Sequence, residues 1–163
     1  MVFYIIIRGP LGIGKSTISE ALARDIKAQY IPIDRILDQH NLTKEWEDGY
    51  ISQKSFIKAN EITVPKAKKL LDMGKTVIFD GNFYWKSQID DLIKRLHYPH
   101  YVFTLKAPLE ICIKRDNERV KTHGKDAAEA VYKKSAQLEY GIVIETENKS
   151  VKDVVNEIEK RLK

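Results

Sequence analysis

Residues 9–16 of this chain, Gly-Pro-Leu-Gly-Ile-Gly-Lys-Ser, fit the pattern G-x-x-x-x-G-K-S of a phosphate-binding P-loop. The glycines allow the backbone to turn tightly through φ values that other residues avoid. The turned loop points successive N–H groups into one concave space, which suits an anionic phosphate. A helix that starts near Lys15 adds the positive end of its dipole to that space. The predicted ligand is a nucleotide, with Lys15 on its β- and γ-phosphates and the Ser16 hydroxyl on Mg²⁺.

The segments on either side of this loop have the sequences that such a loop requires. Residues 2–7 form a continuous apolar run, typical of a strand buried on both faces of a parallel sheet. Residues 16–26 place apolar side chains at helical spacing and predict an amphipathic helix. Strand, glycine loop and helix in this order favour nucleotide binding over the alternative, a glycine-rich turn that binds no nucleotide. The predicted nucleotide-binding residues are Gly9, Leu11, Gly12, Ile13, Gly14, Lys15, Ser16 and Thr17.

The remainder of the chain alternates between predicted strands and predicted helices. Further strands are predicted at residues 30–34, 76–82, 100–105 and 142–145, and further helices at residues 52–73, 86–96, from Pro108, 127–138 and 151–162. Such alternation predicts an α/β fold, namely a three-layer P-loop fold with a parallel five-stranded sheet and helices on both faces. Pro32 predicts an edge position for its strand, because proline cannot donate to a strand ladder. Residues 35–50 are predicted as short helices and loops. With no repeat or linker, we expect one domain over residues 1–163.

Composition and charge describe the expected surroundings of the protein. The single cysteine, Cys112, excludes an internal disulfide and fits a reducing cytoplasm. No apolar run approaches the ~20 residues of a membrane span, and the short N-terminal run differs from a signal peptide. The net charge of +5 permits a polyanionic partner such as nucleic acid without requiring one. We therefore expect a cytoplasmic protein, monomeric or dimeric, without a membrane partner.

Two aspartates follow predicted strands at the edge where a parallel α/β sheet binds its ligand. Asp34 ends the strand at residues 30–34, and Asp80 follows the apolar run of residues 77–79, as a Walker B acid does. We assign Asp34 to activation of an acceptor hydroxyl and Asp80 to Mg²⁺ and acceptor positioning, although the sequence leaves open which acid is the base. Helix capping is the alternative for either. The predicted acceptor-binding residues are Asp34, Arg35, Asp80 and Asn82, and the predicted metal-binding residues are Ser16 and Asp80.

A pair of arginines precedes a polar stretch and suggests a mobile lid. Arg115 and Arg119 are four residues apart, so they share one face of a helix. A lid over residues 115–130 would place one arginine over the adenine and one on the phosphates, and the planar guanidinium of Arg115 suits stacking on adenine. The alternative is a solvated basic helix, which the acidic residues between the two arginines favour.

Several of these segments resemble one kinase family. Residues 107–119 resemble the segment that leads into the lid of small P-loop kinases, most closely the polynucleotide-kinase-like and zeta-toxin-like group, which is related to shikimate- and nucleoside-type kinases. Asp-Gly-Asn at residues 80–82 and Val-Tyr-Lys-Lys at residues 131–134 are similar to motifs that follow the third strand and the lid in polynucleotide kinases. The resemblance implies that Arg119 contacts the phosphates and that Arg115 is its neighbour on the adenine side. The predicted catalytic residues are then Lys15, Asp34 and Arg119.

One position departs from this resemblance. Polynucleotide kinases commonly place an arginine three residues after the acid of the second strand, where it helps to hold the acceptor phosphate. Here that position is Leu37, and Arg35 directly follows Asp34. The acceptor therefore stays open among a small metabolite, a nucleoside or nucleotide, and a nucleic-acid 5′ end. The predicted function is transfer of the γ-phosphoryl group of ATP, with Mg²⁺, to a hydroxyl of such an acceptor.

Two other classes of function are alternatives. A P-loop ATPase or nucleotide switch would pass phosphate only to water, and the absence of an N-K-x-D motif argues against a GTPase. A nucleic-acid-binding module would use the P-loop for anchorage. Residues 83–85, Phe-Tyr-Trp, either stack on a base in the acceptor site or cover the edge of the sheet, and the sequence favours neither.

Overall fold

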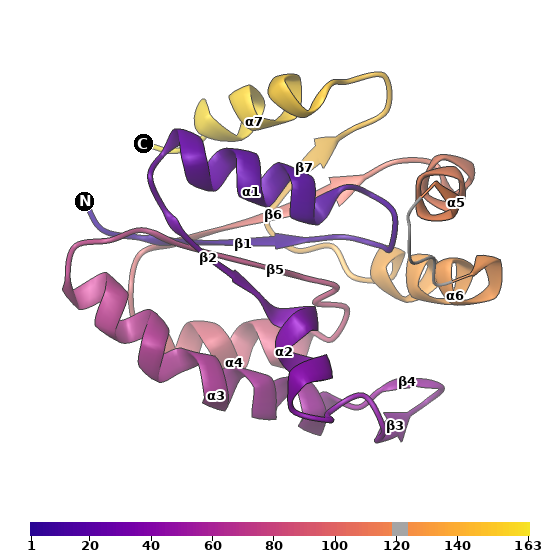
Figure 1. Cartoon of the computed structure of the whole chain (residues 1–163), viewed down its shortest axis with the longest axis horizontal. Coiled ribbons are helices and arrows are strands. Elements are labelled where there is room, and N and C mark those ends of the chain that lie inside the picture. The colour runs from indigo at the N-terminus through magenta and orange to yellow at the C-terminus, as the bar shows by residue number, and fades with distance from the viewer. Residues whose placement is uncertain (119–123) are drawn as a thin grey trace.

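A computed structural model describes residues 1–118 and 124–163, and its core is a five-stranded sheet (Figure 1). Every neighbouring pair of strands is parallel. The strands lie in the order β2 (Gln29–Pro32), β5 (Val77–Gly81), β1 (Tyr4–Arg8), β6 (His100–Lys106) and β7 (Ile142–Glu145). This order confirms the predicted parallel sheet and places β1, which leads into residues 9–14, at its centre.

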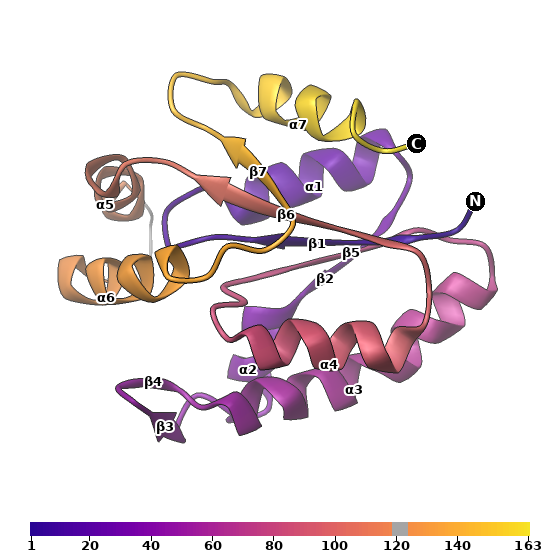
Figure 2. The same ribbon diagram turned by 180° about the vertical axis from the view of Figure 1, so that it is seen from behind.

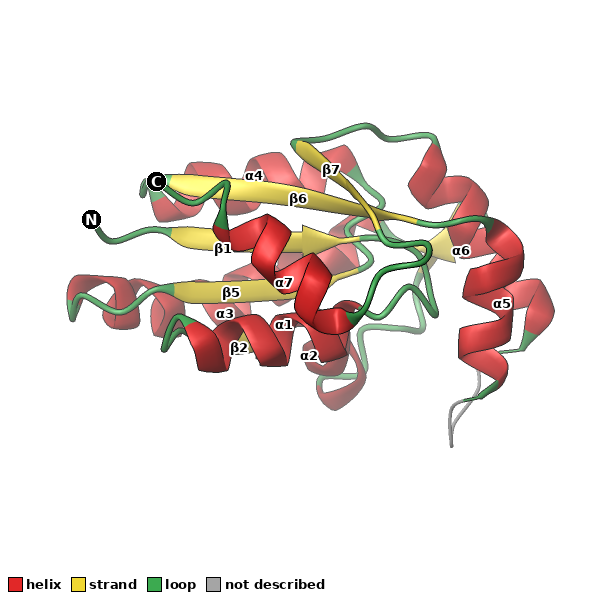
Figure 3. Ribbon diagram, turned by 90° about the horizontal axis from the view of Figure 1, so that it is seen from above, coloured by secondary structure: helices red, strands yellow, loops and turns green. Residues whose placement is uncertain are grey.

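Helices cover both faces of the sheet (Figures 1 and 2). Helices α1 and α7 lie on one face and α3 and α4 on the other, whereas α5 and α6 lie beyond the carboxyl ends of the strands (Figure 3). No helix in the described part of the chain is long and apolar enough to span a lipid bilayer. The helices are α1 (Lys15–Asp25), α2 (Ile33–Gln39), α3 (Gln53–Asp72), α4 (Lys86–Leu96), α5 (Leu109–Asn117), α6 (Lys125–Ala136) and α7 (Val151–Glu159).

The packing of β1 explains why residues 4–7 are apolar. Tyr4 and Ile6 belong to the hydrophobic cluster that includes side chains of α3 and α4. Ile5 and Ile7 belong to the cluster on the other face, which includes side chains of α1 and α7. All four side chains are fully buried. Because β1 is covered on both faces, the side chains of residues 4–7 are apolar on either side of the sheet, as predicted from the sequence.

The second strand is shorter than predicted, and this changes the place of Asp34. Strand β2 pairs only with β5, so the predicted edge position of Pro32 is confirmed. Pairing ends at Pro32, and α2 begins at Ile33, whose side chain is fully buried. Asp34 therefore lies in the first turn of a helix rather than at the end of a strand. A carboxylate is stabilised there by the positive end of the helix dipole.

Residues 35–50 contribute to a β-hairpin that the sequence analysis missed. Strands β3 (Trp46–Glu47) and β4 (Tyr50–Ile51) pair in antiparallel orientation. Asp48 and Gly49 connect them with positive φ angles of 53° and 84°, as a two-residue hairpin turn requires. The Asp-Gly pair was the available signal, but strands of two residues are too short to show an alternating pattern. The hairpin lies near α6, at the end of the molecule that carries the P-loop (Figures 1 and 2).

Candidate active site

The backbone of the P-loop turns at glycines with positive φ angles, which other residues rarely adopt. Gly14 precedes α1 with a φ of 99°, and Gly12 has a φ of 77°. A Cβ atom at Gly12 would lie 2.1 Å from the carbonyl oxygen of Cys112, in α5. The loop therefore packs directly on the helix that leads toward the predicted lid. Any side chain at Gly12 would separate the two.

The side chain of Lys15 is almost fully buried across the loop. Its Nζ atom donates hydrogen bonds of 2.9 Å to the carbonyl oxygen of Pro10 and 3.3 Å to Oδ1 of Asn82. Asn82 follows β5, so this contact joins the P-loop to the neighbouring strand end. The structure thus brings together Lys15 and Asn82, which the sequence analysis placed in one site from separate motifs.

Asp80 lies in β5, beside β1 and β2, and is buried. Its Oδ2 atom accepts a 2.7 Å hydrogen bond from the hydroxyl of Tyr30, in β2. Burial raises the pKa of Asp80 to about 6, and the negative charge of Asp34 acts in the same direction. The hydrogen bond from Tyr30 and the positive charge of Lys15 lower the pKa in part. A carboxyl group with a pKa of about 6 changes its protonation state close to neutral pH.

Asp34 approaches the same strand end from α2. Its Oδ1 atom accepts a 3.4 Å hydrogen bond from the backbone N–H of Asn82. A Cβ atom at Gly81 would lie 3.3 Å from the same oxygen, so the glycine lets the carboxylate approach the strand. Arg35, the next residue, is exposed and lines the same cavity as Asp34 and Asp80. All four predicted acceptor-binding residues therefore line one cavity.

Two cavities flank the P-loop, and both are lined by Gly12, Gly14 and Ser16. The first has a volume of about 480 Å³ and lies between the loop, Arg115 and residues 146–154. The second has a volume of about 490 Å³ and lies between the loop, α2, the hairpin and α6. We call the first the base-side cavity and the second the acceptor-side cavity. A nucleotide bound along the P-loop would therefore border both cavities.

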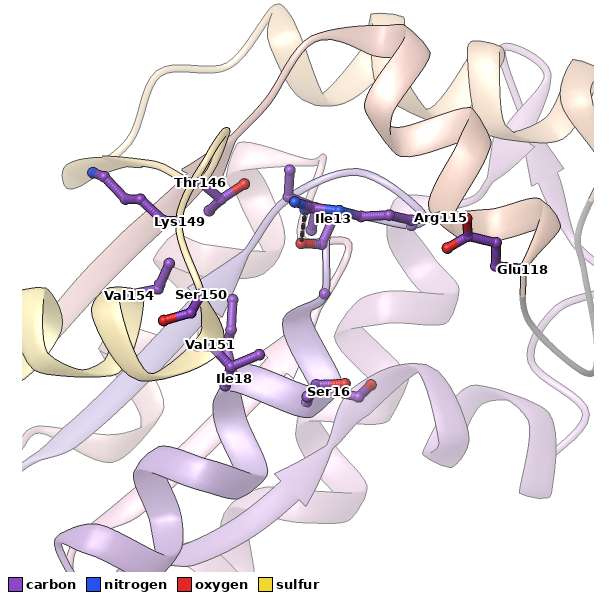
Figure 4. A pocket seen from close by; sticks show the side chains of 13 residues that line it. Ile13, Ser16, Ile18, Arg115, Glu118, Thr146, Lys149, Ser150, Val151 and Val154 are labelled. Atoms are coloured by element: carbon purple, nitrogen blue, oxygen red, sulfur yellow. Dashed lines mark hydrogen bonds between the residues drawn. The ribbon is translucent and has the colours of Figure 1, made fainter.

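Figure 4 shows the base-side cavity. Arg115 extends from α5 toward the P-loop, and its Nη1 atom donates a 3.1 Å hydrogen bond to the carbonyl oxygen of Ile13. On the opposite wall, Thr146 and Lys149 lie in the segment that joins β7 to α7, and Val151 is the first residue of α7. Arg115 is thus held beside the loop, on the side predicted for the adenine. Arg119, the other predicted lid arginine, lies outside the described residues.

The predicted Mg²⁺ ligands, Ser16 and Asp80, lie close to one another. Burial and the charge of Asp80 raise the pKa of the Tyr30 hydroxyl, whereas the Ser16 side chain lowers it, so both groups adjoin that hydroxyl. A hydroxyl and a carboxylate suit Mg²⁺, which prefers oxygen ligands and takes others from phosphates and water. In the part of the chain that the structure describes, no three His, Cys, Asp or Glu side chains form a metal cluster. The donor set therefore fits an ion shared with a nucleotide.

Arg8 holds α6, one wall of the acceptor-side cavity, against the sheet, and the sequence analysis did not identify it. Its guanidinium is fully buried at the end of β1. It donates hydrogen bonds to the carbonyl oxygens of Phe83 (3.1 Å), Ser135 (3.1 Å) and Leu138 (2.9 Å) and to Oγ1 of Thr104 (3.0 Å). Burial lowers the pKa of Arg8 to about 10, so the side chain stays charged at neutral pH. The available signal was a charged residue at the end of an apolar strand.

The aromatic residues 83–85 take structural places around the acceptor-side cavity. Phe83 is fully buried, and Trp85 donates a 2.7 Å hydrogen bond from Nε1 to the carbonyl oxygen of Ile51. Tyr84 accepts a 3.1 Å hydrogen bond from the N–H of Ile51, and of the three it alone lines the cavity. Lys134 of α6 lies 3.7 Å above the Trp85 ring. These residues therefore hold the hairpin and α6 together.

The sequence matches the model of the family described as AAA domain over residues 5–139. The structure is similar to a sugar kinase from a Janibacter species (TM-score 0.78, 16% identity, 98% of this chain and 94% of that chain). It is also similar to a gluconokinase from Sinorhizobium meliloti (TM-score 0.72, 16% identity, 94% and 87%). A shikimate kinase from Acinetobacter baumannii in complex with shikimate is a third similar structure (TM-score 0.64, 18% identity, 100% and 97%). No curated protein matches the sequence. The chain thus has the fold predicted from the small P-loop kinase resemblance.

Proposed function

This chain belongs to the AAA domain family, and we propose that it is an ATP-dependent kinase that phosphorylates a hydroxyl group. The observation that carries the proposal is the pair of cavities that share the P-loop residues Gly12, Gly14 and Ser16. A donor nucleotide needs one cavity, and a hydroxyl-bearing acceptor needs the other. The similarity to sugar and shikimate kinases supports a hydroxyl acceptor, which is a small metabolite, a nucleoside or nucleotide, or a nucleic-acid 5′ end.

The P-loop would bind the donor. Its backbone N–H groups and the Lys15 ammonium would hold the β- and γ-phosphates. Ser16 and Asp80 would hold Mg²⁺, which neutralises charge on the phosphate oxygens when bound. Arg115, hydrogen-bonded to the loop, would lie beside the adenine.

Transfer would take place between the two cavities. The Asp34 carboxylate would accept the proton of the acceptor hydroxyl as its oxygen bonds to the γ-phosphorus. The bond from that phosphorus to the β–γ bridging oxygen would break and leave ADP. Asp80 and Asn82 would orient the acceptor, and Arg35 would contact it at the mouth of the cavity. Arg119 would stabilise the transferred group, as part of a lid at residues 115–130.

The wider organisation is part of the same proposal. We place all of residues 1–163 in one kinase domain that works in the cytoplasm, as a monomer or dimer. Neither a membrane nor a nucleic acid is needed for the mechanism, although an oligonucleotide 5′ end is one of the acceptors to be tested.

The main competing function is an ATPase or nucleotide switch that passes phosphate only to water. The acceptor-side cavity argues against it, because water needs no cavity of about 490 Å³. The two functions differ in a direct measurement. Addition of the correct acceptor should accelerate consumption of ATP in a kinase, and the label should appear in a new phosphate ester.

The test is transfer of label from γ-labelled ATP, with Mg²⁺, to pools of metabolites, nucleosides and a 5′-hydroxyl oligonucleotide. Lys15→Ala and Asp34→Asn should each lower transfer by at least about 100-fold, because each removes a group that acts on the transferred phosphoryl or the acceptor. Lys68→Ala and Asp25→Asn change exposed residues and serve as matched controls with unchanged transfer. Label released only as inorganic phosphate, at a rate no acceptor changes, would contradict the kinase.

A further inference from the structure

The wall of the acceptor-side cavity that lies away from the P-loop is largely aromatic and apolar. The hairpin contributes Trp46 and Tyr50, and the end of β5 leads to Tyr84. Helix α6 contributes Ala127, Ala130 and Val131 from the other side. We infer that the acceptor is an uncharged or cationic alcohol with a planar ring, and that this ring packs on Trp46. The inference rests on the proposed kinase function and specifies its substrate class.

Trp46 is the first observation that supports this inference. Its side chain lines the cavity and yet is 63% exposed. An indole left in water is a favourable platform for a flat apolar ligand, because stacking removes both surfaces from water. The cavity reaches from Trp46 to Asp34 and Asp80. A molecule with a ring at one end and a hydroxyl at the other would therefore satisfy both ends of the cavity.

The second observation is that the aromatic wall is held in place before any ligand binds. The backbone N–H of Ile51 donates to the Tyr84 hydroxyl, and its carbonyl oxygen accepts from Trp85. The Tyr50 and Tyr84 rings contact each other edge to face, with their centroids 5.5 Å apart. The Glu47 carboxylate accepts two hydrogen bonds from Gln53, at the start of α3. A hairpin fastened at both strands loses little conformational entropy on binding, which favours a built ring site over a passive loop.

The third observation is the charge of the cavity. Among its described lining residues, Asp34, Asp38 and Asp80 are acidic, and Lys15 and Arg35 are basic. Lys15 is hydrogen-bonded to the P-loop and to Asn82, and the proposed mechanism assigns it to the phosphates of the donor. Asp34 and Asp38 are four residues apart on α2, so a carboxylate or phosphate on the acceptor would meet two like charges there. Arg35, the remaining basic residue of the cavity, offsets only one of these two charges, so charge favours a neutral or cationic acceptor over a sugar acid.

Small side chains on α6 shape the remaining space. Ala127 and Ala130 are three residues apart and share one face of the helix, and both line the cavity. Because alanine projects little beyond the backbone, this face of α6 leaves room for a ligand group between it and the aromatic wall. A ring stacked on Trp46 can therefore occupy the cavity without a bulky side chain of α6 in its way.

Binding to the protein saturated with Mg²⁺ and a non-hydrolysable ATP analogue tests this inference. Phenylethylene glycol, phenylethanolamine and mandelate share one hydroxylated phenyl skeleton but are neutral, cationic and anionic, so they separate charge from shape. We expect the first two to bind at least about tenfold more tightly than mandelate, gluconate or shikimate, with a change in tryptophan fluorescence. Equal or tighter binding of the three carboxylates, or no binding of either expected probe, would overturn the inference.

Variants connect the binding to the named residues. Trp46→Ala should weaken the binding of phenylethylene glycol by roughly 5- to 150-fold, the range for loss of one aromatic stacking contact, and Trp46→Phe should restore most of it. Met73→Ala, which changes another exposed apolar residue, should have no effect. Asp38→Asn should reduce the ratio of the affinity for phenylethanolamine to the affinity for mandelate, whereas Asp25→Asn should leave this ratio unchanged. An unchanged ratio in Asp38→Asn would overturn the charge argument.

A parallel transfer assay keeps this inference separate from the kinase proposal. Label from γ-labelled ATP on gluconate or shikimate, but on no neutral or cationic alcohol with a planar ring, would overturn the substrate class and leave the kinase standing. Label on a 5′-hydroxyl oligonucleotide in preference to adenosine would replace the small alcohol with a nucleic-acid end. Label on no acceptor, with the ring-bearing probes bound as expected, would overturn the kinase and leave the ring site.

Discussion

The hydroxyl of Tyr30 donates a 2.7 Å hydrogen bond to Oδ2 of Asp80, and so joins the edge strand β2 to the acid of β5. Burial and the charge of Asp80 both raise the pKa of Tyr30, so its hydroxyl stays protonated and remains a donor. The same bond lowers the pKa of Asp80 against the effect of burial. Tyr30 is therefore a positioning residue for a carboxylate that we assign to Mg²⁺ and the acceptor.

Removal of the Tyr30 hydroxyl should weaken Mg²⁺ binding. In Tyr30→Phe the Asp80 carboxylate loses a hydrogen bond that favours its charged form, so the Mg²⁺ concentration for half-maximal turnover should rise by roughly tenfold. Titration of turnover with Mg²⁺ measures this. Tyr98→Phe is the matched control, because the Tyr98 hydroxyl also donates to an aspartate, Asp72, but on the exposed surface. An equal effect of the two variants would contradict a specific role for Tyr30.

The raised pKa of Asp80 should make the free protein less stable as the pH rises. The pKa is about 6 in the folded protein against an ordinary 3.8, so between these values the folded chain binds more protons than the unfolded chain. The free energy of unfolding then falls with rising pH, by roughly 3 kcal/mol once the pH exceeds about 6. Asp80→Asn removes this dependence.

Urea unfolding without nucleotide or Mg²⁺ at about pH 4 and about pH 7 measures the effect. The stability of Asp80→Asn relative to the natural protein should rise between the two values of pH. Asp90, which is exposed and whose pKa is lowered by its hydrogen bond from Lys86, provides the comparison: its titration lies mostly below this pH range, so the relative stability of Asp90→Asn should change little between the two values of pH. A constant difference for Asp80→Asn would show that its carboxyl titrates alike in both states.

Replacement of Arg8 should destabilise the protein and loosen α6. Arg8→Lys keeps a positive charge, but one ammonium group cannot bond all the acceptors of Arg8 at once. These acceptors lie after β5, in β6 and around the end of α6. We expect a loss of about 3 kcal/mol in the free energy of unfolding, because buried carbonyl oxygens lose their donors. Arg95→Lys, at a half-buried arginine of the surface paired with Asp91, should lower the free energy of unfolding by at most about 0.5 kcal/mol.

Hydrogen exchange provides the local measurement for Arg8→Lys. Amides of α6 should exchange faster than in the natural protein by a larger factor than those of α1, because Arg8 bonds the carbonyl oxygens of Ser135 and Leu138. Equal acceleration in both helices would show that the substitution lowers global stability without a specific effect on α6.

Two glycines with nearly equal φ angles allow the close packing of the P-loop to be tested. Gly12 has a φ of 77° and Gly74 has a φ of 79°, but only at Gly12 would a Cβ atom meet another group, the carbonyl oxygen of Cys112 at 2.1 Å. Gly74→Ala should cost about 1 kcal/mol from backbone strain alone. Gly12→Ala should lower the free energy of unfolding by more than Gly74→Ala does. It should also abolish the binding of ATP, which calorimetry measures. Similar effects of both variants would contradict the packing argument.

Local sequence patterns were sufficient for most of the fold. The apolar run of residues 2–7 predicted a doubly covered strand, because burial on both faces leaves no polar position. Residues 86–96 were predicted as a helix with the bounds that α4 has in the structure. The pattern was less reliable for Asp34, because strand pairing ends at Pro32 and the packing of Ile33 starts a helix there.

The sequence by itself determined the P-loop, the alternation of strands and helices, and the acids at one edge of the sheet, because each depends on neighbouring residues. The tertiary structure alone decided that Tyr30 bonds Asp80, that Arg8 ties α6 to the sheet, and that Trp46 faces the acceptor-side cavity. These relationships join residues that are distant along the chain. Their geometry depends on how the strands are ordered and how the hairpin is fastened, and no local pattern contains that information.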